Sequence, residues 1–147
     1  MSVIPNDLSK INLSGVHVFV VEDDADSRDL LSEVLGYCGA LVHTCTSTEE
    51  ALADLKQFLP SVILCDLSLP GADGFAFIRA LRKLPGKRGG LLPAIAISAY
   101  YEDFARPEAL RLGFNDYLEK PLDLNRLGTT IARLIWVTQR TATEKLT

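Results

Sequence analysis

The chain has 147 residues, of which 48% are hydrophobic and 23% charged, and its formal net charge is −4. This balance is typical of one folded domain and excludes a chain that is disordered throughout. The negative charge disfavours direct binding to nucleic acid. No apolar run is long enough to cross a bilayer, and the polar N-terminus lacks the apolar core of a signal peptide. We therefore expect a cytoplasmic protein with no membrane insertion.

Short β-like runs alternate with amphipathic helix-like runs along the chain. Apolar residues spaced by three and four indicate the helices, and Ser47 with Glu50 forms a capping box at the second one, which we expect Pro60 to end. Pro107 lies inside the fourth expected helix, so that helix could begin instead near Arg106. The expected strands are residues 16–21, 40–45, 61–66, 94–98 and 115–119. The expected helices are residues 24–38, 47–59, 73–83, 102–112 and 123–139.

Five strands that alternate with five helices predict an α/β fold, a doubly wound parallel sheet with helices on both faces. We expect the domain to span residues 15–139, with an N-terminal tail at 1–14 and a C-terminal tail at 140–147. In such folds, ligands bind beyond the carboxyl ends of the strands, where the strand order reverses. That edge of the sheet is therefore the place to look for chemistry.

Polar side chains stand where four of the expected strands end. Glu22 and Asp23 follow the first strand, Asp66 ends the third, Ser98 ends the fourth, and Lys120 follows the fifth. Carboxylates about 5 Å apart repel by about 3 kcal/mol per pair at an effective dielectric near 20. A hard cation such as Mg²⁺ offsets this repulsion, and a lysine adds further positive charge. Such a site suits a phosphoryl group, with one carboxylate as its nucleophile.

Five short sequences in this order resemble the receiver domain of the two-component response-regulator family. They are VVEDD (20–24), ILCD ending at Asp66, LPGADG (69–74), AISAY (96–100) and YLEKP (117–121). The resemblance covers about residues 16–138. It implies a flavodoxin-like, three-layer α/β/α fold with the strand order 2-1-3-4-5.

The resemblance also assigns the acceptor and the metal ligands. Asp66 resembles the aspartate that accepts the phosphoryl group. Glu22 and Asp23 resemble the acidic pair that holds Mg²⁺ together with Asp66, and the backbone carbonyl of Ser68 resembles a further ligand.

Three other positions resemble the residues that sense the phosphoryl group. Ser98 resembles the switch hydroxyl, and Lys120 the lysine that pairs with a phosphoryl oxygen, followed by Pro121 in the place of a cis-proline. Tyr117 resembles the aromatic switch residue whose ring turns inward on activation. Tyr100, two residues beyond Ser98, could overhang the site and slow attack by water.

The function implied is that of a phosphorylated signalling domain, not a conventional enzyme, although it would assist its own phosphotransfer and slow autodephosphorylation. The donor would be a phosphohistidine of a sensor histidine kinase or a histidine phosphotransfer protein, and the output would be binding to a downstream protein. A free-standing regulator and the receiver of a hybrid histidine kinase are both compatible with the sequence. A homodimer through the fourth helix, fifth strand and fifth helix is compatible as well.

Two alternatives stay open. A receiver that has lost phosphorylation would act as an interaction scaffold. An aspartate-nucleophile phosphatase of the haloacid-dehalogenase type would need a second aspartate two residues after Asp66, where this chain has Ser68.

Cysteines and histidines carry no evident chemistry in the sequence. Cys38, Cys45 and Cys65 form no Cys-x-x-Cys pair, so neither a zinc site nor a disulfide scaffold is indicated. His17 and His43 lie in expected strands, where we interpret them as structural.

Overall fold

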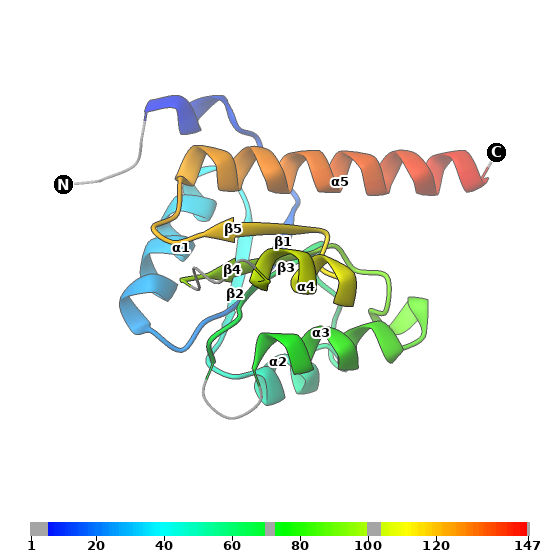
Figure 1. Cartoon of the computed structure of the whole chain (residues 1–147). Coiled ribbons are helices and arrows are strands. Elements are labelled where there is room, and N and C mark those ends of the chain that lie inside the picture. Colours follow the sequence, from blue (N-terminus) through cyan, green and yellow to red (C-terminus); the bar gives the residue numbers. More distant parts are fainter. Residues whose placement is uncertain (1–5, 70–72, 100–103, 147) are drawn as a thin grey trace.

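The computed structural model describes residues 6–69, 73–99 and 104–146. Within these ranges, five parallel strands form one sheet in the order β2-β1-β3-β4-β5, which confirms the expected fold (Figure 1). The strands are β1 (His17–Val21), β2 (Leu41–Cys45), β3 (Val62–Asp66), β4 (Ala94–Ser98) and β5 (Asp116–Glu119). Each differs from its expected range by one residue at most.

Five α-helices and two short 3₁₀-helices connect and flank the strands. The helices are α1 (Ala25–Tyr37), α2 (Thr48–Asp54), α3 (Gly74–Lys83), α4 (Ala105–Leu112), α5 (Leu124–Leu146), η1 (Asn6–Lys10) and η2 (Gly86–Arg88). None of these described helices combines the length and the apolar character that crossing a membrane requires.

Alternating residues of the strands build one core on each face of the sheet. Phe19 and Val21 of β1 belong to the core beneath α2, α3 and α4, whereas Val18 and Val20 belong to the core beneath α1 and α5. All five residues of β3 and of β4 are buried, as expected for central strands that helices cover on both sides. The result is a three-layer α/β/α domain (Figure 1).

Side-chain caps fix the starts of the first three helices. Asp24, Ser47 and Asp73 precede α1, α2 and α3, and each accepts a hydrogen bond from the backbone N–H three residues later, at 2.9–3.1 Å. Gly39 follows α1 with φ +100°, a conformation that a residue with a Cβ rarely adopts. These boundaries agree with the sequence pattern.

The second helix is shorter than expected. It ends at Asp54, and the N–H groups of Lys56 and Gln57 bond to carbonyls three residues back, as in a tightened final turn. Phe58 and Leu59 are therefore 40% and 41% exposed rather than buried on a helix face. The prediction that Pro60 ends this helix was wrong, because the chain leaves the helix five residues earlier.

The segments expected as tails also differ from expectation. Leu8 and Leu13 are buried at 0% and 1% exposure in the core beneath α1 and α5, and the Leu13 N–H donates to the Cys38 carbonyl at 2.7 Å. Helix α5 continues through residue 146, and its last turns extend past the sheet (Figure 1). Apolar burial accounts for the ordered N-terminal segment, since both leucines would otherwise face water.

Helix α4 begins at Ala105, close to the later of the two starts that the sequence allowed. Pro107 is then its third residue, within the first turn, where a backbone N–H has no intrahelical acceptor to lose. The earlier start at residue 102, and the overhang expected from Tyr100, fall on residues outside the described ranges.

The half-buried guanidinium of Arg82 ties α3 to the strand that follows α4. The Arg82 side chain donates to the carbonyls of Gly90, Leu92 and Gly113 and to Oδ1 of Asn115, at 2.7–3.1 Å. Asn115 Oδ1 in turn accepts from the N–H of Ala94 at the start of β4. Arg82 therefore satisfies carbonyls of the loops that lead into β4 and β5. Its planar guanidinium carries several N–H donors and so can bond these acceptors together.

We predict that Arg82→Lys lowers the free energy of unfolding by about 2–4 kcal/mol, because a lysine cannot reach these acceptors together and leaves buried carbonyls unsatisfied. Urea denaturation measures the change. Arg79→Lys on the exposed side of the same helix is the control, with an expected change within about 0.5 kcal/mol. Equal effects of the two substitutions would contradict the bridging role of Arg82.

Candidate functional site

The carboxyl ends of the strands bring together the residues that the sequence pointed to. Glu22 follows β1, Asp66 is the last residue of β3, and Lys120 follows β5, joined to Pro121 by a cis peptide bond. Glu22 and Asp66 are almost fully buried, at 3% and 5% exposure, whereas Asp23 is exposed. The strand order reverses between β1 and β3, so these acids occupy the expected ligand-binding edge.

Lys120 lies between the two buried carboxylates. Its Nζ donates to Oε1 of Glu22 at 2.8 Å and to Oδ2 of Asp66 at 2.9 Å. Its backbone N–H donates to the carbonyl of Ser98 at 2.8 Å, which ties the end of β4 to the same place. Ser98 itself is fully buried. The structure thus brings Lys120, the two buried acids and Ser98 together, as the sequence predicted.

Both oxygens of Asp66 are held in place. Oδ2 accepts from Lys120, and Oδ1 accepts from the N–H of Ser68 at 2.9 Å and from its hydroxyl at 3.2 Å. The start of α3 closes in behind this turn, since a Cβ on Gly74 would lie 2.8 Å from Leu67 Cα and 3.0 Å from the Asp66 carbonyl oxygen. The orientation of this carboxylate is therefore set before any ligand binds.

The environment separates the pKa values of the two buried acids. Burial raises the pKa of Glu22 to about 7, although the hydrogen bond from Lys120 opposes the shift. Burial also pushes the pKa of Asp66 upward, but hydrogen bonds from Lys120 and from the Ser68 N–H outweigh it, so the pKa is lowered. Asp66 is thus the carboxylate kept ionised as a nucleophile must be.

The acidic cluster has the composition of a site for a hard cation. Carboxylate oxygens of Glu22, Asp23 and Asp66 all lie within 4.8 Å of one another. A set made only of oxygens suits Mg²⁺ or Ca²⁺ rather than a softer metal. The contribution of the Ser68 backbone carbonyl remains a prediction.

Sequence reasoning missed Arg28 of α1. Its Nη1 donates to the carbonyls of Glu22 and Asp23, at 2.9 and 2.8 Å. These contacts fix the backbone of the acidic pair from the side of the first helix. The one available clue was a basic residue one turn after the cap at Asp24.

Tyr117 is buried in this structure. Its side chain is 2% exposed and belongs to the core beneath α2, α3 and α4, and the Arg106 guanidinium lies 5.9 Å from its ring centroid. The ring is therefore turned inward in this structure, and the movement on activation that the resemblance implies stays a prediction. Burial of its large apolar surface explains the preference.

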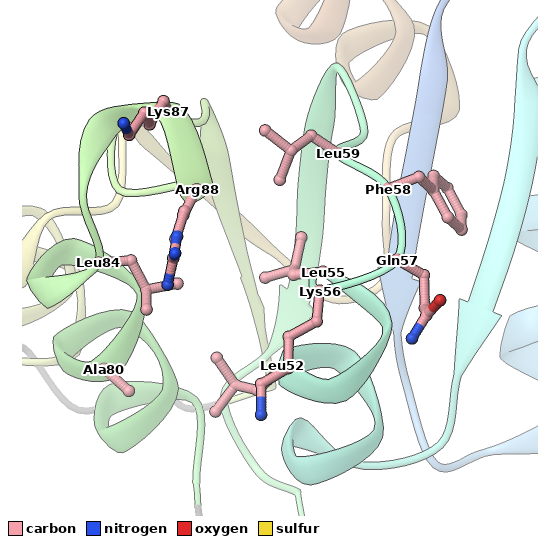
Figure 2. A pocket seen from close by; sticks show the side chains of 10 residues that line it. All are labelled: Leu52, Leu55, Lys56, Gln57, Phe58, Leu59, Ala80, Leu84, Lys87 and Arg88. Atoms are coloured by element: carbon pink, nitrogen blue, oxygen red, sulfur yellow. The ribbon is translucent and has the colours of Figure 1, made fainter.

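A sizeable cavity lies away from these acids. It has a volume of about 740 Å³ and lies between the end of α2 and helix α3, lined by leucines together with Lys56, Lys87 and Arg88 (Figure 2). Neither Asp66 nor Lys120 reaches it, so the cavity takes no part in the chemistry of the strand ends.

Fold and site together define a doubly wound α/β domain with a cluster of acidic residues at the switch point of its parallel sheet. The family model of the response regulator receiver domain matches residues 18–132. The chain belongs to this family, whose members are phosphate-accepting domains of two-component signalling and not classical enzymes.

Individual relatives agree with this assignment. An uncharacterized 14.6 kDa protein of Leptolyngbya boryana is 45% identical over 111 residues, which cover 76% of this chain and 83% of that protein. The DNA-binding transcriptional regulator NtrC of Salmonella typhimurium is 33% identical over 118 residues, but this match covers 80% of this chain and 24% of NtrC. The crystal structure of the Vibrio cholerae chemotaxis protein CheY4 covers 81% of this chain and 98% of CheY4, with a TM-score of 0.74 and 26% identity.

We predict that Glu22→Gln changes the pH dependence of stability in metal-free buffer. Folding raises the pKa of Glu22 from an ordinary 4.5 to about 7, so ionisation of Glu22 costs the native protein stability as pH rises through this window. Glutamine does not ionise. The stability of the variant relative to wild type should therefore increase by about 2–3 kcal/mol between pH 4.5 and 7.5.

Urea unfolding in chelator across this pH range provides the measurement. Glu33→Gln, on the exposed side of α1, is the matched control and should leave the pH profile unchanged. A constant difference between Glu22→Gln and wild type would show that Glu22 titrates normally in the folded protein.

Proposed function

We propose that Asp66 accepts a phosphoryl group from a phosphohistidine of a sensor histidine kinase or of a histidine phosphotransfer protein. The observation that carries this proposal is the pairing of buried Asp66 with Lys120 beside two further acids, Glu22 and Asp23. The arrangement provides a fixed nucleophile, a fixed positive charge and a cluster of oxygen ligands at one place.

The transfer follows from these positions. A carboxylate oxygen of Asp66 attacks phosphorus, a P–O bond forms, and the P–N bond to the donor imidazole breaks. The donor imidazole leaves as a neutral ring that carries a proton on one of its two nitrogens. Lys120 then pairs with a phosphoryl oxygen in place of the carboxylate oxygen it now contacts, and the Ser98 hydroxyl bonds another.

Glu22, Asp23 and Asp66 would hold Mg²⁺, with the Ser68 carbonyl as a further ligand. The bound ion would supply positive charge to the phosphoryl oxygens and relieve the repulsion among the three acids. Without a bound metal ion, burial and the neighbouring Asp66 raise the pKa of Glu22, so its charged form is disfavoured. We therefore expect phosphorylation of Asp66 to depend on a divalent cation that offsets the charge of these acids.

The output we propose is binding to a downstream protein through the surface of α4, β5 and α5. On this surface Arg133 pairs with Asp116 at 2.8 Å, and Arg106 lies 4.0 Å from the same carboxyl group. A homodimer would use the same charged surface. The proposed phosphohistidine donor places the exchange in the cytoplasm, and both a free-standing regulator and a hybrid-kinase receiver fit this scheme.

Two other functions predict different chemistry. A scaffold that has lost phosphorylation has no use for the Lys120–Asp66 pair. A haloacid-dehalogenase-type phosphatase requires a general acid two residues after the nucleophile, and Ser68 instead donates to Asp66 there. Slow loss of the phosphoryl group to water by the domain itself is compatible with the proposal.

We predict that Asp66→Asn abolishes phosphorylation while the fold survives, because the amide is nearly isosteric but is not a nucleophile. The measurement is the intact mass after incubation with acetyl phosphate and Mg²⁺, where wild type should gain one phosphoryl group. Asp26→Asn, an exposed substitution in the first turn of α1, is the control and should label like wild type.

The other outcomes separate the alternatives. Wild type that gains no mass with Mg²⁺ would favour the scaffold. Steady release of phosphate from unrelated phosphate esters would favour the phosphatase. Labelling of Asp66→Asn at the wild-type rate would place the acceptor elsewhere.

We predict that the Ser98→Ala variant accepts the phosphoryl group but does not undergo the structural change in β5 that follows in wild type. The Ser98 hydroxyl would contribute a hydrogen bond of about 1.5–3 kcal/mol that exists only in the phosphorylated state, enough to shift a two-state equilibrium about tenfold or more. Amide chemical shifts of residues 104–120 with and without beryllofluoride test this, with Ser32→Ala as the control. Shifts in Ser98→Ala equal to those of wild type would show that Ser98 does not couple the site to β5.

A further inference from the structure

A second cluster of metal-ligating side chains lies between β2 and α2. His43 and Cys45 are two residues apart on β2, so they point to the same face of the sheet, toward α2. Asp54, the last residue of α2, points back: its Oδ2 lies 2.6 Å from His43 Nε2 and 3.6 Å from Cys45 Sγ. One imidazole, one thiol and one carboxylate thus place their ligand atoms within 4.8 Å of one another.

Aromatic rings fix the imidazole of this cluster. The ring centroid of His43 lies 4.8 Å from that of Phe19 and 5.5 Å from that of Phe58, the latter at an interplanar angle of 83°. In Figure 2 the Phe58 ring points away from the cavity between α2 and α3 and toward the strands. The early end of α2 is what allows this, because the chain after Asp54 turns back over β2.

Solvent reaches two of the three candidate ligands of this cluster but does not reach the sulfur. Cys45 is fully buried, whereas the side chains of His43 and Asp54 are 40% and 28% exposed. A metal ion could therefore enter from the solvent side. Three protein ligands and one open position are the arrangement of zinc sites that also bind water.

We propose that His43, Cys45 and Asp54 bind a divalent transition metal of the zinc class, with water as the fourth ligand. With metal–ligand bonds of about 2.0–2.3 Å, a tetrahedral site places neighbouring ligand atoms roughly 3.3–3.7 Å apart. The Cys45–Asp54 separation already falls in this range. The His43–Asp54 separation needs to open by about 0.8 Å, a small rotation of a half-exposed aspartate.

Charge balance favours such an ion. Binding transfers the thiol proton of Cys45 to solvent, and the resulting thiolate and the Asp54 carboxylate neutralise a divalent cation, with His43 as a neutral ligand. In the absence of metal, burial and the neighbouring Asp54 and Glu50 raise the pKa of the Cys45 thiol to about 12. The thiol is then protonated, so the metal must displace this proton.

Ligand chemistry separates this site from the acidic one. Sulfur and nitrogen ligands favour zinc and its neighbours, whereas the oxygens of Glu22, Asp23 and Asp66 favour Mg²⁺. The two sites are nonetheless adjacent in the backbone, because the Glu22 N–H donates to the Cys45 carbonyl at 2.9 Å. The zinc-class site does not depend on phosphorylation of Asp66.

The test is a titration of the chelator-treated full chain with Zn²⁺ in excess Mg²⁺, followed by native mass spectrometry and calorimetry. We expect one Zn²⁺ per chain. Co²⁺ in its place should give the charge-transfer absorption of a cobalt–thiolate bond. Cys45→Ser should abolish that absorption, and His43→Gln and Asp54→Asn should each weaken Zn²⁺ binding by about tenfold or more.

Matched variants keep the result interpretable. His17→Gln and Cys38→Ser change the same residue types outside the cluster and should bind Zn²⁺ like wild type, as should Asp66→Asn. Circular dichroism confirms that each variant is folded, and the partly exposed His43 and Asp54 are the positions least disruptive to replace. No bound Zn²⁺, or binding that survives all three cluster substitutions, would overturn the proposal. Binding lost in Asp66→Asn would place the metal at the acidic site instead.

Discussion

One ammonium group, that of Lys120, lies between two carboxylates that the sheet buries at the ends of β1 and β3. Two such acids without a cation would repel by about 3–4 kcal/mol at an effective dielectric near 20, in addition to the cost of burying them. Lys120 is 98 residues from Glu22 in sequence, so this contact exists only if all five strands take their places in order. The site and the topology of the sheet therefore depend on each other.

Burial of the central strands explains why the chemistry is confined to their last residues. Helices cover β3 and β4 on both faces, so every earlier position must be apolar, and Asp66 and Ser98 stand where the cover ends. Gly74 then brings the start of α3 within van der Waals distance of the turn after Asp66. Asp66 is thus held at the boundary between the apolar core and the solvent, where burial opposes its charge and hydrogen bonds fix its orientation.

The strand order was implied by the family resemblance. The convergence of Glu22, Asp66, Ser98 and Lys120 and the cap at Ser47 were predicted from the residues themselves, because they follow from where parallel strands end and from local pattern. The sequence did not predict the contacts that depend on three-dimensional packing. Arg82, for example, satisfies carbonyls from two separate loops, the one that precedes β4 and the one that precedes β5. The early end of α2 and the buried Leu8 and Leu13 were also missed, because apolar spacing alone does not show where a helix stops or what a flanking segment covers.

A chain of contacts leads from the acceptor to the face of α4 and α5 along β5. Lys120, which directly follows β5, bonds Asp66 through its side chain and Ser98 through its backbone. Tyr117 of β5 precedes it by three residues. The Tyr117 carbonyl accepts from Arg106 of α4 at 3.2 Å, and neighbouring Asp116 accepts from Arg133 of α5 at 2.8 Å. Both arginine contacts are therefore made by residues of β5 that lie within four positions of Lys120, so this strand links the acidic cluster to the two helices.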